Sequence, residues 1–281
     1  MTVDLLLVAG GLTVLLAGAW QVVRSAVVIA LMFGLSRVVG GATVVAFGTS
    51  APEFVISFIA ALEGSSGLAF GNVLGSNVAN VALVLGSAAL VAPLIVNARL
   101  VQWEIPVLIA ATAAVLLFGA NGTIGRLEGG LLFLGGLLGF IFASLLLVPS
   151  PSVIDGDGEE DERPPKTATA LSIAGGLLLV GLTALAVGAA VAVEGATGIA
   201  QRVGMSELAV GVSIVAVGTS LPEVATSLMA AMRREHDIAV AAVVGSNIFN
   251  ILSILGATAV IAPIAVSGRF AIWDGPIMAA I

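Results

Sequence analysis

Two short motifs that combine hydroxyls, amides and a carboxylate each occur twice in this chain. GTSAPE at residues 48–53 is matched by GTSLPE at 218–223, and GSNVAN at 75–80 is matched by GSNIFN at 245–250. Each pair is offset by 170 positions, from 48 to 218 and from 75 to 245. All four copies lie in long apolar stretches, where a carboxylate is costly and usually functional. Two acids at matching points of two halves predict one cation site shared between the halves.

Each copy of the first motif predicts a polar stripe on a broken helix. The first stripe consists of Ala46, Thr49, Ser50, Glu53 and Ser57. The second consists of Ala216, Thr219, Ser220, Glu223 and Ser227. These spacings place each set on one face of a helix. Pro52 and Pro222 lack the N–H of a helical hydrogen bond, so we expect both helices to bend there and to free backbone carbonyls.

The second motif places a hydroxyl and an amide four residues apart in each copy: Ser76 with Asn80, and Ser246 with Asn250. Gly75 and Gly245 remove side chains where we expect a neighbouring helix to approach closely. Four further polar residues fit a site and, equally, a hydrogen bond to a neighbouring helix. They are Ser57, Ser227, Asn77 and Asn247.

The donors in these stripes are all hard oxygens, which suit Na⁺ and Ca²⁺ better than Zn²⁺ or Cu²⁺, and better than the reluctantly dehydrated Mg²⁺. Glu53 and Glu223 together carry two negative charges when ionised, which one Ca²⁺ or two Na⁺ would balance. An empty site would bury two like charges. The loaded states can therefore cross the membrane barrier more easily than the empty one, which favours obligatory exchange.

Composition predicts a membrane protein. The 281 residues are 59% hydrophobic and 10% charged, which leaves too little polar surface for a soluble domain of this size. The absence of cysteine excludes disulfides and thiolate metal sites. The net charge of −7 owes much to the acidic run at 155–162, and such a run is usually just solvated. We expect an all-α polytopic membrane protein whose partners are inorganic cations and the lipid bilayer, with no nucleic acid.

Apolar runs long enough to cross about 30 Å of hydrocarbon, roughly 20 residues each, divide the chain. They lie near 3–23, 40–62, 68–92, 100–119, 127–148, 169–192, 209–232 and 238–262, with a ninth beginning at 270. Five spans fall within one offset, so the second half should enter the membrane in the opposite sense. We expect an inverted repeat of 5+5 transmembrane helices, with the tenth helix missing from this chain. The first half is 1–149 with its motifs at 41–87, the acidic linker is 150–168, and the second half is 169–281 with its motifs at 211–257.

Basic residues favour an N-terminus outside the cell membrane. With that orientation the cytoplasmic loops hold Arg24, Arg37, Arg99, Arg163, Lys166, Arg233 and Arg234. The outer loops hold Arg126, Arg202 and Arg269. Six acids near the ends of the spans are expected at the interface: Glu63, Glu104, Glu128, Glu194, Glu207 and Asp274. The oligomeric state is left open, and a monomer is compatible with the sequence.

The doubled motifs resemble the two α-repeats of the cation/Ca²⁺ exchanger superfamily, and within it the prokaryotic sodium/calcium exchangers. The matching segments are VVAFGTSAPEFVIS (44–57), GNVLGSNVANV (71–81), VAVGTSLPEVATS (215–227) and VVGSNIFNI (243–251). The resemblance implies a ten-helix, alternating-access antiporter that transports Na⁺ and Ca²⁺ as substrates, has no organic cofactor and is not an enzyme.

The resemblance also implies roles for individual residues. The Ca²⁺ ligands would be Thr49, Glu53, Thr219 and Glu223. The Na⁺ positions would be formed by Ser50, Ser76, Ser220 and Ser246, with the carbonyls of Ala46 and Ala216. Asn80 and Asn250 would border the middle position. Some relatives have Asp where this chain has Asn250, which weakens the case for K⁺ co-transport, and the hydroxyls of the GTS segments favour Na⁺ over H⁺ coupling.

Three alternatives are weighed against Na⁺/Ca²⁺ antiport. A H⁺/Ca²⁺ exchanger is the main one, because paired carboxylates can also titrate. A passive cation channel would conduct without a counter-ion. An intramembrane hydrolase would need a base for its nucleophile, and the only histidine, His236, falls in an expected loop away from both GTS segments.

Overall fold

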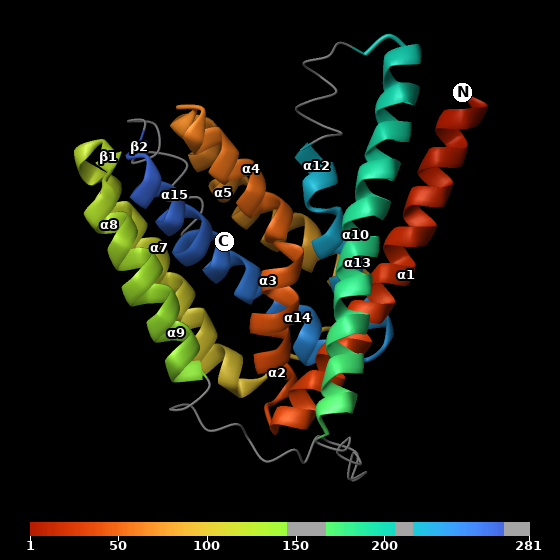
Figure 1. The fold of residues 1–281 in the computed structure, drawn as a ribbon, viewed down its shortest axis with the longest axis horizontal. Helices are drawn as coiled ribbons and strands as arrows, with labels where there is room; N and C mark the ends of the chain where they lie inside the picture. The colour runs from red at the N-terminus through yellow and green to blue at the C-terminus, as the bar shows by residue number, and fades with distance from the viewer. Residues whose placement is uncertain (145–166, 206–215, 267–281) are drawn as a thin grey trace.

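The computed structural model describes residues 1–144, 167–205 and 216–266, and this part of the chain is almost entirely helical (Figure 1). Five helices are long and apolar enough to cross a membrane, and a bent pair, Arg37–Thr49 with Ala51–Leu62, makes a sixth candidate. The five are Thr2–Phe33, Ser66–Val91, Leu100–Asn121, Ala168–Arg202 and His236–Ile261. The expectation of an all-α polytopic membrane protein is confirmed.

The first half begins with α1 (Thr2–Phe33), and a second span is built from α2 (Arg37–Gly40), the π-helical η1 (Gly41–Val45), α3 (Ala46–Thr49) and α4 (Ala51–Leu62). The third contains α5 (Ser66–Ala79), η2 (Asn80–Leu85) and α6 (Gly86–Val91). The fourth contains η3 (Leu100–Glu104), α7 (Ile105–Phe118) and η4 (Gly119–Asn121). After strand β1 (Thr123–Ile124) follow α8 (Arg126–Gly130), η5 (Leu131–Leu137) and α9 (Leu138–Phe142).

The described part of the second half repeats this order. It contains α10 (Ala168–Arg202), α12 (Ala216–Thr219), α13 (Leu221–Met232), α14 (His236–Phe249), η8 (Asn250–Leu255) and α15 (Gly256–Ile261). Strand β2 (Ile264–Ala265) pairs antiparallel with β1. The expected linker falls mostly outside the described residues, as do residues 206–215 of the seventh span and the ninth span from 270.

Two expected boundaries are wrong because charged residues are accommodated within helices. The first helix continues to Phe33, ten residues past the expected end at 23. Arg24, expected in a loop, is an exposed residue of α1, with its guanidinium carbon 5.2 Å from the centre of the Trp20 ring. Likewise, α10 continues to Arg202, and His236 begins α14 instead of lying in a loop.

Helices α1 and α10 lie side by side and run in opposite directions (Figure 1). Residue numbers rise along one helix as they fall along the other, so that Gly11 meets Ala192 and Gly18 meets Leu185. A Cβ added at Gly11 would come 2.4 Å from the backbone nitrogen of Ala192. Small residues thus permit backbone contact, and the opposite directions are those that an inverted repeat requires.

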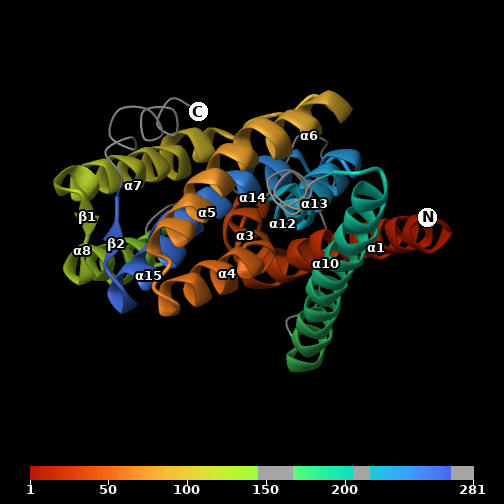
Figure 2. The same cartoon turned by 90° about the horizontal axis from the view of Figure 1, so that it is seen from above.

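The core of the described molecule is the segment His236–Ile261, whose most apolar window is 100% buried, against 33% for its counterpart Ser66–Val91. It runs between the α4 and α7 helices and also packs on η1, α3 and α5 (Figure 2). At Gly245 a Cβ would lie 2.4 Å from the carbonyl oxygen of Ala42, so the expected close approach is confirmed there. At Gly75 no described residue lies within 4 Å of an added Cβ. The position that mirrors Ala42 is 212, which lies outside the described residues, so the expectation at Gly75 stays a prediction.

Candidate functional site

Both copies of the first motif form a broken helix, as the prolines predict. In the first half the axis bends by 47° between α3 and α4, at Ser50. Pro52 occupies the first turn of α4, where a missing N–H costs nothing. Ser220 separates α12 from α13 with nearly the same backbone angles, φ −88° and ψ 1° against φ −82° and ψ 5° at Ser50. Each break therefore places a hydroxyl residue just before a half-helix begins.

The two carboxylates lie in the first turns of these half-helices and converge in the interior. Glu53 in α4 is 2% exposed and Glu223 in α13 is 4% exposed. The Glu223 carboxylate lies within electrostatic reach of Glu53 and is approached by the side chains of Thr49 and Ser50. Residues of the two halves thus form one buried cluster of oxygen-bearing side chains, which we call the chamber. The N-terminal end of a helix favours negative charge, which helps to hold an acid at each position.

Ten of the twelve predicted ligand residues are buried: Ala46, Thr49, Ser50, Glu53, Ser76, Asn80, Ser220, Glu223, Ser246 and Asn250. Thr219 is half-buried, and Ala216 begins α12. The Thr49 hydroxyl lies 3.2 Å from the Val45 carbonyl and 3.4 Å from that of Ala46, and donates to the backbone. Its oxygen lone pairs are therefore directed away from its own proton and can accept.

Six buried oxygens of the predicted set have no hydrogen-bond partner among the residues that the structure describes. They are Ser50 Oγ, Glu53 Oε2, Asn80 Oδ1, Glu223 Oε2, Ser246 Oγ and Asn250 Oδ1. Buried polar atoms in native proteins are almost always paired, and leaving them unpaired is costly. Since all six are hard oxygens, the donor set fits Na⁺ or Ca²⁺ as a transported ion.

No cationic side chain neutralises these acids within the described ranges, because none of the ion pairs there involves Glu53 or Glu223. The same residues contain no cluster of three or more His, Cys, Asp or Glu that could hold a metal. An ion at this site would thus be held by two carboxylates and neutral oxygens. This is the donor balance of a site that binds an alkali or alkaline-earth ion.

The structure overturns one expectation about acids at span ends. Glu104 is 1% exposed, and its Oε1 accepts from Nε of the buried Arg99 at 3.2 Å. The Arg99 guanidinium also donates to the Ser144 carbonyl at 2.9 Å. Glu104 is therefore not an interfacial residue. The buried pairing partner allows a charge to lie inside the helical bundle.

The sequence analysis missed one asparagine of this region, Asn72, and left the roles of Asn77 and Asn247 open. Asn72 donates to the Ser57 hydroxyl at 2.9 Å and to the Glu53 carbonyl at 3.2 Å. The position 170 residues after Asn72 is Ala242, so Asn72 is not repeated in the second half and a comparison of the two halves does not find it. Asn77 and Asn247 bond across the two halves, so for them the helix-to-helix alternative is confirmed.

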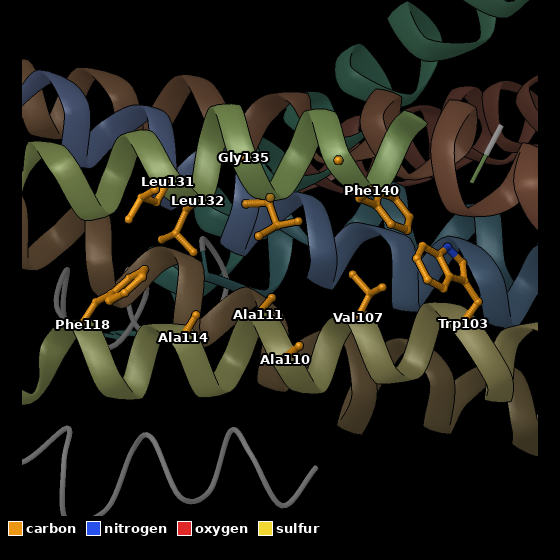
Figure 3. Close-up of a pocket in the computed structure, with 13 residues that line it drawn as sticks. Trp103, Val107, Ala110, Ala111, Ala114, Phe118, Leu131, Leu132, Gly135 and Phe140 are labelled. Atoms are coloured by element: carbon orange, nitrogen blue, oxygen red, sulfur yellow. The ribbon is translucent and has the colours of Figure 1, made fainter. Parts of the chain in front are cut away.

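A separate cavity of about 330 Å³ lies between the fourth and fifth spans (Figure 3). Trp103, Val107, Ala111 and Phe118 line it from one helix and face Leu131, Leu132, Gly135 and Phe140 across the gap. Its lining is apolar apart from the Trp103 ring nitrogen, which donates to the Ser144 hydroxyl at 3.0 Å. It offers no oxygen cage for a cation.

Comparisons with known proteins identify the family. The family model described as sodium/calcium exchanger protein matches residues 3–154 and 173–281. CaxA of Alkalimonas amylolytica is 39% identical over 285 residues, covering 100% of this chain and 88% of that protein. The inner membrane protein YrbG of Escherichia coli is 35% identical, covering 90% of this chain and 78% of that protein.

Solved structures extend the likeness to three dimensions. The sodium-calcium exchanger NCX_Mj, in a structure soaked without Na⁺ and Ca²⁺, superposes with a TM-score of 0.83 at 28% identity. The match covers 99% of this chain and 88% of that chain. Family, sequence and fold therefore agree that this chain is a cation/Ca²⁺ antiporter, a multi-pass membrane protein and not an enzyme, and that it belongs to the sodium/calcium exchanger family.

Proposed function

We propose that this antiporter exchanges Na⁺ for Ca²⁺ across the cell membrane by alternating access. The observation that carries the proposal is the buried chamber, in which one oxygen of each carboxylate and four neutral oxygens lack partners among the described residues. No arginine or lysine in that part of the chain pairs with the two acids. One Ca²⁺ or two Na⁺ would neutralise Glu53 and Glu223, so either load makes the same chamber electrically acceptable. The structural relative NCX_Mj is a sodium-calcium exchanger, which supports the choice of ions.

We assign the twelve predicted residues as the ligands of these ions. Glu53 and Glu223 supply the charge, with Thr49 and Thr219 beside them for Ca²⁺. Neutral oxygens complete the Na⁺ positions. They are the hydroxyls of Ser50, Ser76, Ser220 and Ser246 and the backbone carbonyls of Ala46 and Ala216. Asn80 and Asn250 supply amide oxygens in the middle.

The transport test uses purified protein in proteoliposomes loaded with Na⁺ and diluted into Na⁺-free buffer that contains radioactive Ca²⁺. Uptake should exceed that of empty vesicles and should collapse when the Na⁺ gradient is removed. Because two Na⁺ balance one Ca²⁺ in the chamber, a third Na⁺ would make transport electrogenic, and a potassium-diffusion potential would then change its rate. Uptake no greater than in empty vesicles would defeat the proposal.

A H⁺/Ca²⁺ exchanger is the second candidate, because two acids that share one chamber can also take up protons. It predicts that a pH gradient drives Ca²⁺ uptake in the absence of Na⁺. Uptake that follows the Na⁺ gradient and does not respond to a pH gradient excludes this alternative.

We also propose an N-terminus outside the cell, with residues 1–149 and 169–281 as the two inverted halves and 150–168 as a cytoplasmic linker. The distribution of Lys and Arg supports this orientation. The opposite directions of α1 and α10 support the inverted relation of the two halves. A cysteine introduced at position 158 in this cysteine-free chain should react with a membrane-impermeant reagent only in inside-out vesicles. Labelling in intact cells would reverse the orientation.

A further inference from the structure

Helices α5 and α14 meet through a reciprocal set of four hydrogen bonds between asparagines, two from each half. The Asn77 amide donates to the Asn247 carbonyl at 3.3 Å, and the Asn247 amide donates to the Asn77 carbonyl at 3.2 Å. The Asn80 amide donates to Asn247 Oδ1 at 3.0 Å, and the Asn250 amide donates to Asn77 Oδ1 at 3.0 Å. All four side chains are buried. We call these four residues the asparagine lattice.

The lattice fixes which way each amide points. An isolated asparagine can present either its oxygen or its NH₂ group after a half-turn of the amide. A backbone carbonyl only accepts, so Asn77 and Asn247 must turn their NH₂ groups toward each other's carbonyls. Their own oxygens then face the other two asparagines, which must present NH₂ groups in turn. Asn80 and Asn250 are left with their oxygens free of any partner among the described residues, as their Oδ1 atoms show.

The two free oxygens lie where the carboxylate helices pass. Asn80 begins η2, which packs against α13, the helix of Glu223. Asn250 begins η8, which packs against α4, the helix of Glu53. Each half of the chain therefore presents an amide oxygen next to the carboxylate helix of the other half.

We propose that Asn77 and Asn247 are positioning residues, which hold the amide oxygens of Asn250 and Asn80 toward the transported cation without contacting it. This inference rests on the proposed assignment of Asn80 and Asn250 as ion ligands. A flipped amide would present N–H hydrogens to the cation and remove a ligand. The lattice thereby makes the middle of the chamber accept cations only, and it does so without adding charge to the two carboxylates.

Equilibrium binding of radioactive Ca²⁺ to purified full-length protein tests the inference, because binding does not depend on which counter-ion drives transport. Asn77→Leu keeps the branching of the side chain and removes both of its lattice bonds. We expect its Ca²⁺ dissociation constant to rise about tenfold, the effect of losing one well-oriented ligand. Ser144→Ala also loses a buried hydrogen bond, the one from the Trp103 ring nitrogen, but lies outside the lattice and the proposed ligands. It is the matched control and should bind within about twofold of the wild type.

A double-mutant cycle separates positioning from general structural damage. Asn77 acts through Asn250, so once Asn250→Ala has removed that oxygen, adding Asn77→Leu should weaken binding little further. In the Asn80→Ala background, Asn77→Leu should raise the Ca²⁺ dissociation constant by its full factor, because Asn80 bonds to Asn247 and not to Asn77. The mirror cycle, Asn247→Leu with Asn80→Ala, provides the same test if the first variant does not fold.

Two results would overturn the inference. One is a Ca²⁺ affinity for Asn77→Leu within about twofold of the wild type. The other is a result in which Asn77→Leu raises the Ca²⁺ dissociation constant by the same factor in the Asn250→Ala background as in the Asn80→Ala background. Failure of the proposed Na⁺ coupling gives a different pattern, because wild-type Ca²⁺ binding and both cycles would persist while Na⁺-driven uptake was absent.

Discussion

Asn72 donates its amide to the hydroxyl of Ser57 at 2.9 Å, and the second half of the chain has no equivalent bond. The position 170 residues after 72 is Ala242, and the hydroxyl of Ser227, the counterpart of Ser57, has no partner among the described residues. Both serines are at most 1% exposed. The two halves therefore repeat the proposed ligands but differ in the hydrogen bonds one turn beyond each carboxylate.

This difference predicts unequal costs for the same substitution. Ser57→Ala should lower the free energy of unfolding by about 1 kcal/mol, because it removes a buried hydrogen bond and leaves part of the Asn72 amide unpaired. Ser227→Ala removes an already unpaired hydroxyl and should leave stability unchanged or slightly raised. Thermal unfolding in detergent compares the two variants. Equal losses at both positions would contradict the asymmetry.

Close packing at Gly245 predicts that this glycine cannot be replaced. A Cβ there would lie 2.4 Å from the Ala42 carbonyl oxygen and 2.6 Å from its Cα, and backbone atoms cannot move aside easily. Gly245→Ala should therefore separate α14 from η1 and cost about 1–3 kcal/mol, as overpacking typically does. Gly71→Ala is the control, because no described residue lies within 4 Å of its Cβ and its counterpart is already Ala241. The thermal stability of both variants is measured as the fraction of protein that stays monodisperse on heating. The argument is refuted if Gly71→Ala destabilises the protein and Gly245→Ala does not.

The buried pair of Arg99 and Glu104 predicts a large effect when one partner is removed. Glu104→Gln should destabilise the protein by about 3 kcal/mol, because the Arg99 charge then lacks its carboxylate in a buried site. Removing both charges, with Arg99→Met and Glu104→Leu together, should recover much of that loss. Arg202→Gln breaks the pair with Asp4, in which the arginine side chain is 58% exposed, and should cost about 1 kcal/mol or less. Unfolding midpoints rank the variants, and a double variant less stable than Glu104→Gln would count against the pair.

If Glu53 and Glu223 bind Ca²⁺, then Ca²⁺ should stabilise the wild-type protein and should not stabilise variants in which either acid is neutral. Wild-type protein at a Ca²⁺ concentration about 100 times its dissociation constant should gain about 2.7 kcal/mol. Glu53→Gln and Glu223→Gln keep the side-chain shape but remove one charge, so we expect most of this gain to vanish and transport to cease. Glu63→Gln, at the exposed end of α4, should retain both. The thermal shift with and without Ca²⁺ is the measurement, and a full shift in Glu53→Gln would rule out its role as a ligand.

Much of the fold could be predicted because it depends on residue types that repeat at a fixed spacing. Pro52 and Pro222 predict helix breaks from their missing N–H groups alone, and both breaks are present. Long apolar runs predict spans for the same local reason. The errors fall where a distant partner changes the cost of a charge, since burial of Glu104 depends on Arg99 and Ser144.

The sequence by itself determined that two acids and a set of hard oxygens recur at one offset in an apolar chain. It could not decide which oxygens are free, because that depends on partners supplied by other helices. From the sequence, Asn77 could have been a ligand or a helix-to-helix contact, and only the fold reveals the contact, through its bond to Asn247, 170 positions away. Hydrogen-bond direction is set by the acceptor that the fold brings opposite each amide. The sequence therefore predicts which residues make up the chamber. The directions of their oxygens are set by the contacts between the two halves in the fold.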